Sequence, residues 1–388
     1  MVEWKEIKEV FETRNGYTPS TTNESFWEGG DIPWFKMEDI RDNGGILNDS
    51  YLHITDAAVK GKGLFKANSI LLATSATIGE HALITIDHLS NQRFTNLYPK
   101  AKFEHIINMR YVYYYMFKID EWCKQHVNQG GFASVDMGGL YKLAFPIPSL
   151  SEQERIVDIL DTFTSSIDNL KQQIAQRRKQ YEYYRDQLLD LEGKEGVEMK
   201  TLGEIGVCVA GATPSTKIAD YWEGGNIPWM SSGEVHQKVV THTSSLITQK
   251  GYDNASTKML PVNTIVIALA GQGKTRGSVA ITAIELCTNQ SLCGVIIDNA
   301  QINNKYVYYY MTTRYNDLRR ISSGEGTRGG LNLKMIASYP IPVTSLSEQQ
   351  RIVDILDKFE TSIQNLEAQL SQREKQYEYY RNKLLSFE

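Results

Sequence analysis

The sequence predicts an α+β fold: two similar globular α/β domains separated by two long helices, which pair as an antiparallel coiled coil with pseudo-two-fold symmetry. The first observation behind this prediction is an internal repeat, because SEQERIVDILDTF at 151–163 returns as SEQQRIVDILDKF at 347–359. The second is that short β-rich runs mix with a helical segment before each motif. The third is a heptad pattern of apolar residues within and after each motif. A repeat at about half of the chain length indicates two copies of one module.

The first domain is expected over residues 1–150. SILLATSATIG at 69–79 and HALITI at 81–86 predict strands, because they are short β-rich runs bounded by turn signals. FEHIINMRYVYYYMFKIDEWCKQ at 103–125 predicts a helix. PIPSL at 146–150 ends the domain, since two prolines two residues apart can continue neither a helix nor a central strand.

The second domain is expected over residues 197–346, on the same plan. NTIVIALA at 263–270 corresponds to the first strand, NKYVYYYM at 304–311 to the helix, and YPIPVTSL at 339–346 to the exit. Residues that are identical in both copies, such as the YVYYYM motif, the IPW tryptophan and an Asn-Gln pair, are expected to build the shared scaffold. Positions that differ between the copies are expected to recognise different targets.

Two long helices are expected at 151–192 and 347–388. Ser151 in the first and Ser347 in the second are each followed three residues later by Glu or Gln, the capping-box pattern that starts a helix. GKEG at 193–196 is expected to form the turn and linker after the first helix, because its glycines favour a helix end.

A seam of apolar residues follows each start, at alternating steps of four and three, with neither Gly nor Pro inside. A lone helix would leave this seam in water, so we expect the two helices to pair with each other. The alternative is that each helix packs on its own globular domain. The seam comprises Ile156, Leu160, Phe163, Ile167, Leu170 and Ile174 in the first helix, and Ile352, Leu356, Phe359, Ile363, Leu366 and Leu370 in the second.

Composition is that of a soluble globular protein, with 41% hydrophobic and 22% charged residues. No run of about 18 apolar residues occurs, and the four cysteines show no metal or disulfide spacing, which indicates a cytosolic protein with reduced thiols. The net charge of −5 is uneven: residues 1–150 carry 15 basic and 18 acidic residues, whereas 197–346 carry 13 and 10. If the protein binds DNA, so little positive charge predicts a basic partner.

The candidate contact residues lie where the copies diverge, mainly in Gly-rich loops. ALAGQGKTRG at 268–277 ends like a phosphate-binding loop, but Ala268 stands where that loop needs glycine, so an ATPase is not expected. Polar side chains of such loops can instead hydrogen-bond base edges or phosphates, while the plainer alternative is that they are solvated connections. The candidate DNA-binding residues are Lys36, Thr74, Ser75, Asn128, Ser134, Ser231, Ser232, Gln272, Lys274, Thr275, Arg276, Thr327 and Arg328.

Motifs for catalysis are missing from the sequence. The seven histidines are scattered without metal-ligand spacing, so no metal site is expected. Neither a nucleophile elbow, a cofactor-binding glycine fingerprint, a methyltransferase motif nor a nuclease or helicase core is recognisable. We therefore expect a protein that is not an enzyme and binds no cofactor.

Together, these features resemble the specificity subunit of a type I restriction–modification system. The resemblance rests on the duplicated TPST turn, IPW strand, PIP exit and SEQ-x-RIV helix, and it covers essentially the whole chain. It implies that residues 1–150 and 197–346 are target recognition domains, each reading one half of a bipartite double-stranded DNA site. It also implies that the helices space these domains and dock two methyltransferase subunits, and that a restriction (motor–nuclease) subunit joins for cleavage.

One departure from the family pattern is that the chain starts almost directly in its first domain, so a longer N-terminal conserved segment is not expected. The main alternative function is a coiled-coil scaffold protein with two protein- or peptide-binding domains, which the helices alone do not exclude.

Overall fold

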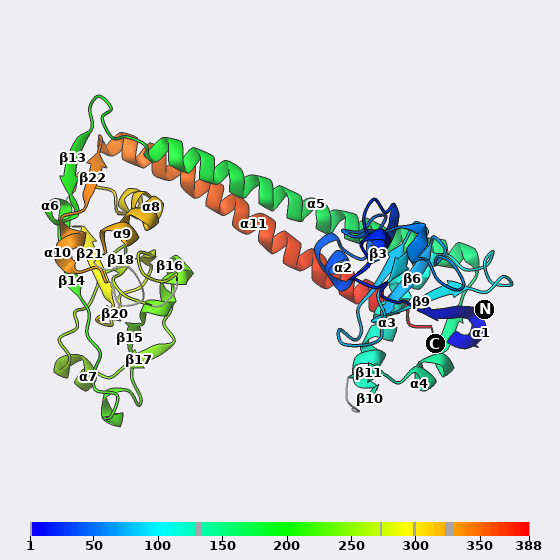
Figure 1. Ribbon diagram of the computed structural model, residues 1–388. Coiled ribbons are helices and arrows are strands. Elements are labelled where there is room, and N and C mark those ends of the chain that lie inside the picture. The colour runs from blue at the N-terminus through cyan, green and yellow to red at the C-terminus, as the bar shows by residue number, and fades with distance from the viewer. Residues whose placement is uncertain (1, 129–132, 272–273, 298–299, 323–329, 388) are drawn as a thin grey trace. The chain divides into compact units, whose positions relative to one another are not determined.

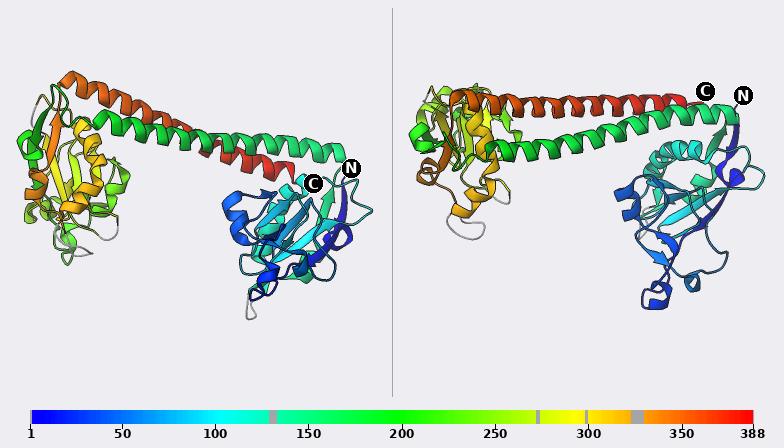
Figure 2. Two further views of the ribbon diagram at one scale, coloured as in Figure 1. Left: turned by 45° about the horizontal axis from the view of Figure 1, so that its top comes forward. Right: turned by 90° about the horizontal axis from the view of Figure 1, so that it is seen from above.

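The computed structural model describes residues 2–128, 133–271, 274–297, 300–322 and 330–387. The chain forms two compact units, one of residues 1–171 with 368–388 and the other of residues 172–367. Each unit therefore contains one globular domain, the first half of one long helix and the second half of the other. Figure 1 labels the elements, and Figure 2 shows the two long helices side by side in two further views.

The domain of the first unit is built on a five-stranded sheet of order β2-β9-β6-β7-β4, antiparallel except for the β4–β7 pair. Its strands are β2 (Phe11–Asn15), β9 (Phe94–Pro99), β6 (Ser69–Ala73), β7 (His81–Ile84) and β4 (Ile46–Leu47). A three-stranded sheet has the order β5-β3-β8, with β5 at His53–Ile54, β3 at Ile32–Phe35 and β8 at Leu89–Ser90. Two ribbons complete it: β1 (Glu3–Glu6) pairs with β12 (Ala144–Ile147), and β10 (Val127–Asn128) with β11 (Ser134–Val135).

Helices α1 (Ile7–Val10), α2 (Met37–Asn43), α3 (Met109–Gln125) and α4 (Met137–Lys142), with 3-10 turns η1 (Glu24–Phe26) and η2 (Asp56–Ala58), precede the long helix α5 (Leu150–Leu189). The expected helix at 103–125 thus begins only at Met109. Asn108 caps it, because its side chain accepts from the amides of Arg110 and Tyr111, and the preceding residues form turns.

The domain of the second unit repeats this topology. Its five-stranded sheet has the order β14-β21-β18-β19-β16, with β14 at Gly206–Ala210, β21 at Leu292–Ile297, β18 at Ile265–Ala268, β19 at Val279–Thr282 and β16 at Val239–Val240. The smaller sheet is β17 (Ser245–Ile247), β15 (Ile227–Met230) and β20 (Cys287–Thr288), and β13 (Glu198–Thr201) pairs with β22 (Pro340–Val343). Its helical elements are α6 (Leu202–Ile205), η3 (Ala219–Tyr221), η4 (Ser232–Gln237), α7 (Gln249–Asn254), α8 (Asn304–Thr313), α9 (Tyr315–Ile321), α10 (Leu333–Ala337) and the long α11 (Leu346–Leu384).

Each five-stranded sheet is buried on both faces, which explains why its central strand reads as a continuous apolar run. In β6, Ile70 and Leu72 join the core beneath α3, whereas Leu71 and Ala73 join the core shared with the three-stranded sheet. This alternation follows the two-residue period of a strand. In both units the helix with the YVYYYM motif packs into the core on one face of the five-stranded sheet. Tyr111 and Tyr306 are 0% exposed, so the assignment of this helix to the scaffold is confirmed.

The long helices begin one residue earlier than the sequence suggested, at Leu150 and Leu346, and each is capped two residues earlier. Ser149, not Ser151, caps α5: its hydroxyl lies 3.4 Å from the amide nitrogen of Glu152. Ser345, not Ser347, does the same for α11, at 3.3 Å from the amide of Glu348. Both serines of each pair fit the capping-box spacing, and the strand that precedes the helix decides between them, because it already ends at Ile147 or Val343.

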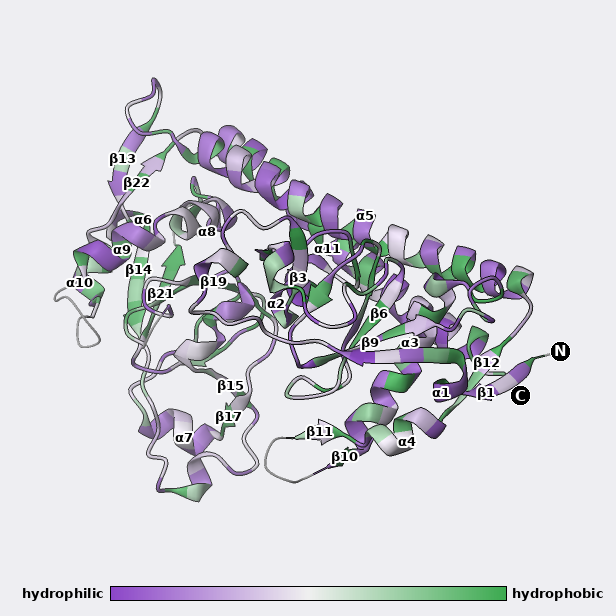
Figure 3. Cartoon of the chain, turned by 45° about the vertical axis from the view of Figure 1, so that its right-hand side comes forward, coloured by the Kyte–Doolittle hydropathy of each residue, from purple (hydrophilic) through white to green (hydrophobic). Residues whose placement is uncertain are grey.

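Both packing alternatives for the long helices contribute to the structure. The first turns pack on their own domain, where Ile156 and Leu160 join one core and Ile352 and Leu356 the other. Farther along, each unit pairs α5 with α11. All twelve seam residues are buried or half-buried. In Figure 3 the helices are mainly hydrophilic, with hydrophobic residues recurring at intervals.

Aromatic stacking marks the helix pairing in each unit. Phe163 stacks on Tyr380 with ring centroids 5.3 Å apart in the first unit, and Tyr184 stacks on Phe359 at 5.6 Å in the second. Within the described residues, none of the helices combines the length and hydropathy of a membrane span. The predicted fold class, a repeated mixed α/β domain with long paired helices, is confirmed.

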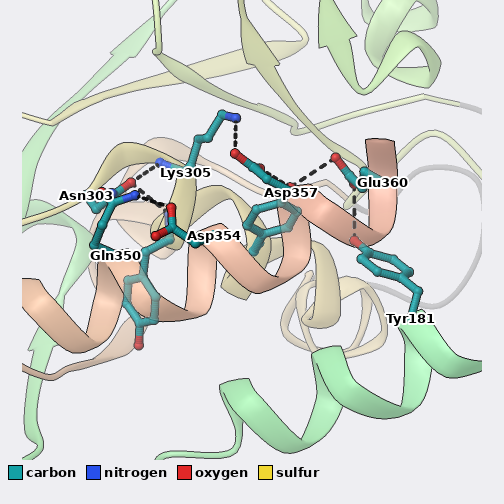
Figure 4. A network of polar contacts seen from close by, with 9 residues as sticks. Tyr181, Asn303, Lys305, Gln350, Asp354, Asp357 and Glu360 are labelled. Atoms are coloured by element: carbon teal, nitrogen blue, oxygen red, sulfur yellow. Dashed lines mark hydrogen bonds and ion pairs between the residues drawn. The ribbon is translucent and has the colours of Figure 1, made fainter. Parts of the chain in front are cut away.

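Polar contacts fix the second domain to its long helix (Figure 4). In the second unit, Asp357 on α11 accepts from Lys305 Nζ and from the Tyr309 hydroxyl, both at 2.6 Å. Glu360 accepts from Tyr309 at 3.0 Å and from Tyr181 of α5 at 3.2 Å, so one carboxylate connects three helices. Burial, and then hydrogen bonding to Asp357, raises the pKa of Tyr309 well above its usual value, so this hydroxyl remains a donor.

Candidate nucleic-acid interface

Three loops meet in the first domain: the turn after β6, the loop between β8 and β9, and the β10–β11 ribbon. The amide of Thr74 donates to the carbonyl of Arg93 at 2.9 Å, and the amide of Val135 donates to the carbonyl of Thr74 at 2.9 Å. Ser75 and Ser134 form an isolated antiparallel bridge. The structure therefore brings the candidates Thr74, Ser75 and Ser134 together, with Asn128 opposite Ser134 in the ribbon.

The second domain joins its equivalent loops through the same backbone contacts. The amide of Leu269 donates to the carbonyl of Ser291 at 2.8 Å, and that of Leu331 to the carbonyl of Leu269 at 2.9 Å. The loop that carries Lys274, Thr275 and Arg276 follows directly. The Tyr315 hydroxyl supports this loop by donating to the carbonyl of Lys274 at 3.0 Å.

The remaining candidates lie beside these loops, at the end of the IPW strand. The residue before Lys36, Phe35, accepts at 3.1 Å from the amide of Asn91, and Met230, the residue before Ser231, accepts at 3.0 Å from that of Asn289. Lys36 and Ser231 thus occupy equivalent places, next to the loop that contacts the end of β6 or β18. Gln272, Thr327 and Arg328 lie outside the described residues.

The candidate side chains differ in how available they are. Asn128 and Lys274 are exposed, and Lys36, Ser75, Ser134, Ser232 and Thr275 are half-buried. Three others are engaged or covered within the domain. The Thr74 hydroxyl lies 3.0 Å from that of Thr95, the Ser231 hydroxyl donates to Glu234 at 2.9 Å, and Arg276 is only 7% exposed. In this conformation these three side chains support the loops from within.

A buried carboxylate holds the loop after the IPW strand in both domains. Glu234 accepts from the amides of Ser231 and Ser244, each at 2.7 Å. Asp39 accepts from those of Lys36 and Tyr51, at 2.6 and 2.7 Å. Burial opposes the charge on Glu234, but the hydrogen bonds from Ser244 and Ser231 outweigh it and keep its pKa below the ordinary value.

Residues that are identical in the two copies form the scaffold behind these loops, as predicted. Gln92 Oε1 accepts from Thr18, and Gln290 Oε1 from Thr213, each at 2.5 Å. The indole nitrogens of Trp34 and Trp229 donate to backbone carbonyls at 2.9 and 3.0 Å. Gly16 lies so close to the backbone of residues 90 and 91 that a Cβ would overlap it, which explains the glycine before the TPST turn.

Arg93 is a candidate that the sequence reasoning missed. It is exposed, and its backbone contacts both Thr74 and the side chain of Asn91. The signal was present, because Arg93 directly follows the shared Asn-Gln pair, whereas the second copy has Ser291 at this position. Arginine is the side chain that most often reads guanine in the major groove.

No group of three His, Cys, Asp or Glu residues in the described ranges is placed to hold a metal ion. Each domain instead presents one group of polar loop residues, which we call its polar tip: the loop after β6 with the β10–β11 ribbon in the first domain, and the loop after β18 in the second. The two tips have the same backbone contacts and different side chains. Such tips can donate and accept hydrogen bonds without performing a reaction.

Comparison with known proteins agrees with a binding role. The model of the type I restriction modification DNA specificity domain matches residues 1–177 and 194–374. The chain belongs to this family. The two matches correspond to the two repeats, each with one domain and most of its long helix.

Two curated members from Escherichia coli are similar in sequence. The specificity subunit of the type I restriction enzyme EcoprrI is 49% identical over 53% of this chain and 54% of its own length. That of EcoR124I/EcoR124II is 40% identical over 63% of each chain. This chain therefore matches about half to two thirds of these specificity subunits. The crystal structure of the M. genitalium S subunit covers 100% of this chain and 97% of its own, with a TM-score of 0.60 and 16% identity, which shows a shared fold.

Proposed function

We propose that this chain is the sequence-specific DNA-binding specificity subunit of a type I restriction–modification complex and recognises a bipartite site in double-stranded DNA. The observation that carries the proposal is the pair of equivalent tips, whose backbone contacts are the same and whose exposed side chains differ. Two domains with the same fold and different contact residues suit a DNA site whose two halves differ in sequence. Membership of the DNA specificity family supports DNA as that target.

In this proposal residues 1–150 read one half-site and residues 197–346 the other. Contacts to bases or phosphates come from Lys36, Ser75, Asn128 and Ser134 in the first domain, together with Arg93. They come from Ser232, Lys274 and Thr275 in the second, while Thr74, Ser231 and Arg276 shape the loops. Gln272, Thr327 and Arg328 stay predictions from the sequence.

The long helices would space the two domains and dock two methyltransferase subunits, and a restriction subunit would join for cleavage. The chain itself would be non-catalytic, hold no cofactor and act in the cytoplasm. Because the first domain is acidic and the second only weakly basic, the methyltransferase subunits would supply much of the phosphate neutralisation.

Methylome sequencing of the host with and without this gene tests the proposal. We expect deletion to remove adenine methylation from one motif that consists of two short specified halves and a fixed gap. Restoring the intact gene should restore that motif. An unchanged methylome, together with capture of a peptide partner by the isolated domains, would favour the scaffold function instead.

Arg93→Ala is expected to weaken binding to the cognate site by about 1–3 kcal/mol, since one guanine-reading arginine contributes about that much discrimination. Fluorescence titration of the assembled complex on duplexes with either half-site changed measures this effect. The loss should follow the half-site read by the first domain. Ser291→Ala, at the equivalent position in the second domain, is the matched control and should leave that half-site unaffected. A loss that is equal on cognate and unrelated DNA would contradict base reading.

A further inference from the structure

The second unit contains a cavity of about 330 Å³ beside its recognition loop. Its wall includes Ser278, whose hydroxyl donates to the carbonyl of Lys274 at 3.1 Å, and Tyr315, which also supports that loop. The long helices also contribute to the wall, through Arg185 and Glu360. The cavity therefore leads from the proposed DNA contacts of the second domain to the helix pair of the same unit.

The first unit closes the equivalent place. Phe117 occupies the position of Thr312 and packs on His81 with ring centroids 4.7 Å apart, while Arg381, the counterpart of Arg185, lies over Phe117 at 4.7 Å. Gly45 lies so close to the Tyr113 ring that any Cβ would overlap its hydroxyl. The smaller Thr312 leaves this space open in the second unit, so the cavity is a difference between two otherwise similar frames.

Lys238 takes the place of that glycine. The carbonyl of Gly45 accepts from the amide of Leu83, and the carbonyl of Lys238 accepts from that of Ile281, each at 2.8 Å. Lys238 has φ 62° and ψ −56°, a backbone conformation with positive φ that residues other than glycine rarely adopt. Glycine would adopt this conformation more easily, so the exposed lysine side chain is present here at a cost in backbone energy.

The charge on the cavity wall favours an anion. Two cations, Arg185 and Lys238, stand beside His236 and a single lining carboxylate, Glu360. Arg185 also forms an ion pair with the exposed Asp186 at 2.7 Å, so the preference for an anion depends mainly on Lys238. That carboxylate already accepts from the hydroxyls of Tyr181 and Tyr309. The adjoining larger cavity, of about 720 Å³, has as many carboxylates as cations among its described residues and therefore no such preference.

We propose that this cavity binds the phosphodiester backbone of DNA next to the half-site that the second domain reads. The inference rests on the proposed function and adds to it a difference between the two units in their affinity for the DNA backbone. The second unit contributes sequence-independent affinity through Lys238 and Arg185, whereas the first unit, closed at this place and acidic, does not. The excess of basic over acidic residues in 197–346, 13 against 10, agrees with this division.

The salt dependence of binding tests the proposal on the assembled complex with cognate duplex DNA. Each lost phosphate contact should reduce the slope of log K against log salt by about 1, so Lys238→Gln with Arg185→Gln should reduce it by about 2. The preference for cognate over scrambled half-sites should be unchanged. Arg381→Gln, at the position of Arg185 in the first unit, is the matched control and should leave the slope as it is.

Lys238→Gly separates a lost contact from misfolding. Glycine relieves the positive φ, so the variant should melt at or above the wild-type temperature while it still loses affinity for DNA. An unchanged slope in the double variant would overturn the proposal, as would a free nucleotide that binds the cavity without changing DNA affinity. Failure of the wild-type complex to prefer any bipartite site would instead overturn the proposed function.

Discussion

Asp120→Ala is expected to remove about 3–5 kcal/mol from the stability of the first domain, because it leaves the buried His81 side chain without its partner. His81 Nδ1 lies 2.6 Å from Asp120 Oδ2, and His81 Nε2 lies 2.9 Å from the carbonyl of Tyr113. The two side chains are only 1% and 6% exposed. Without the Asp120 carboxylate, His81 Nδ1 would lose its partner in a place that is closed to solvent.

Hydrogen exchange resolves this effect by unit. Amides of β7 and α3 should exchange faster in the variant, whereas those of β19 and α8 should not change, because the second domain has Val279 and Tyr315 at the equivalent positions. The double variant His81→Leu with Asp120→Leu should lose less than Asp120→Ala, since replacing both partners by apolar groups leaves neither unpaired. Equal losses in the single and double variants would show that packing, not the pair, provides the stability.

The same pair connects stability to the proposed contacts. His81 opens β7, and the turn before it carries Thr74 and Ser75. If β7 loosens, these residues lose the frame that holds them against Ser134. The variant should therefore lose recognition of the first half-site before that of the second.

Much of the fold could be predicted from the sequence because its signals are periodic. The heptad seam identified the long helices, and the repeat identified two domains. The caps of the long helices were misplaced by two residues because, in the first helix, Ser149 and Ser151 both fit a capping box. Only the end of β12 selects Ser149, and that depends on the pairing of β12 with β1, a contact between the two ends of the domain.

The site was harder to predict, because its residues meet through pairings that no local pattern encodes. The bridge between Ser75 and Ser134 joins segments that are far apart in the chain. The burial of single side chains was equally hard to predict. Arg276 was predicted to contact DNA because it lies in a Gly-rich loop, yet it is only 7% exposed. By contrast, Arg93 could have been found by asking where the two copies diverge directly after a shared motif.

Gln349→Ala is expected to destabilise the second domain by about 3 kcal/mol, because it leaves several backbone groups without a partner at once. Gln349 is fully buried, and its Oε1 accepts from the amide of Asn303 at 2.9 Å. Its Nε2 donates to the carbonyls of Gln301 and Thr344, at 3.1 and 2.8 Å. One side chain thus ties the start of α8, the loop before it and the exit of β22 to the first turn of α11.

Gln153 makes the same three contacts in the first unit, with the amide of Asn108 and the carbonyls of Ile106 and Pro148, at 2.8, 2.8 and 2.9 Å. This explains physically why the SEQ motif appears twice: its glutamine locks a domain onto its helix. Gln153→Ala should therefore destabilise the first domain and Gln349→Ala the second, each weakening recognition of its own half-site.

Two further variants show whether hydrogen bonding is the cause. Gln349→Glu keeps the size of the side chain but cannot donate to the two carbonyls, so thermal and denaturant unfolding should show a loss comparable to that of alanine. Gln350→Ala removes the exposed neighbour, whose contacts with Asn303 and Asp354 face solvent, and should change stability by less than about 0.5 kcal/mol. If Gln349→Glu were as stable as wild type, packing alone would hold the second domain on its helix. The orientation of each domain on its helix would then not depend on the glutamine.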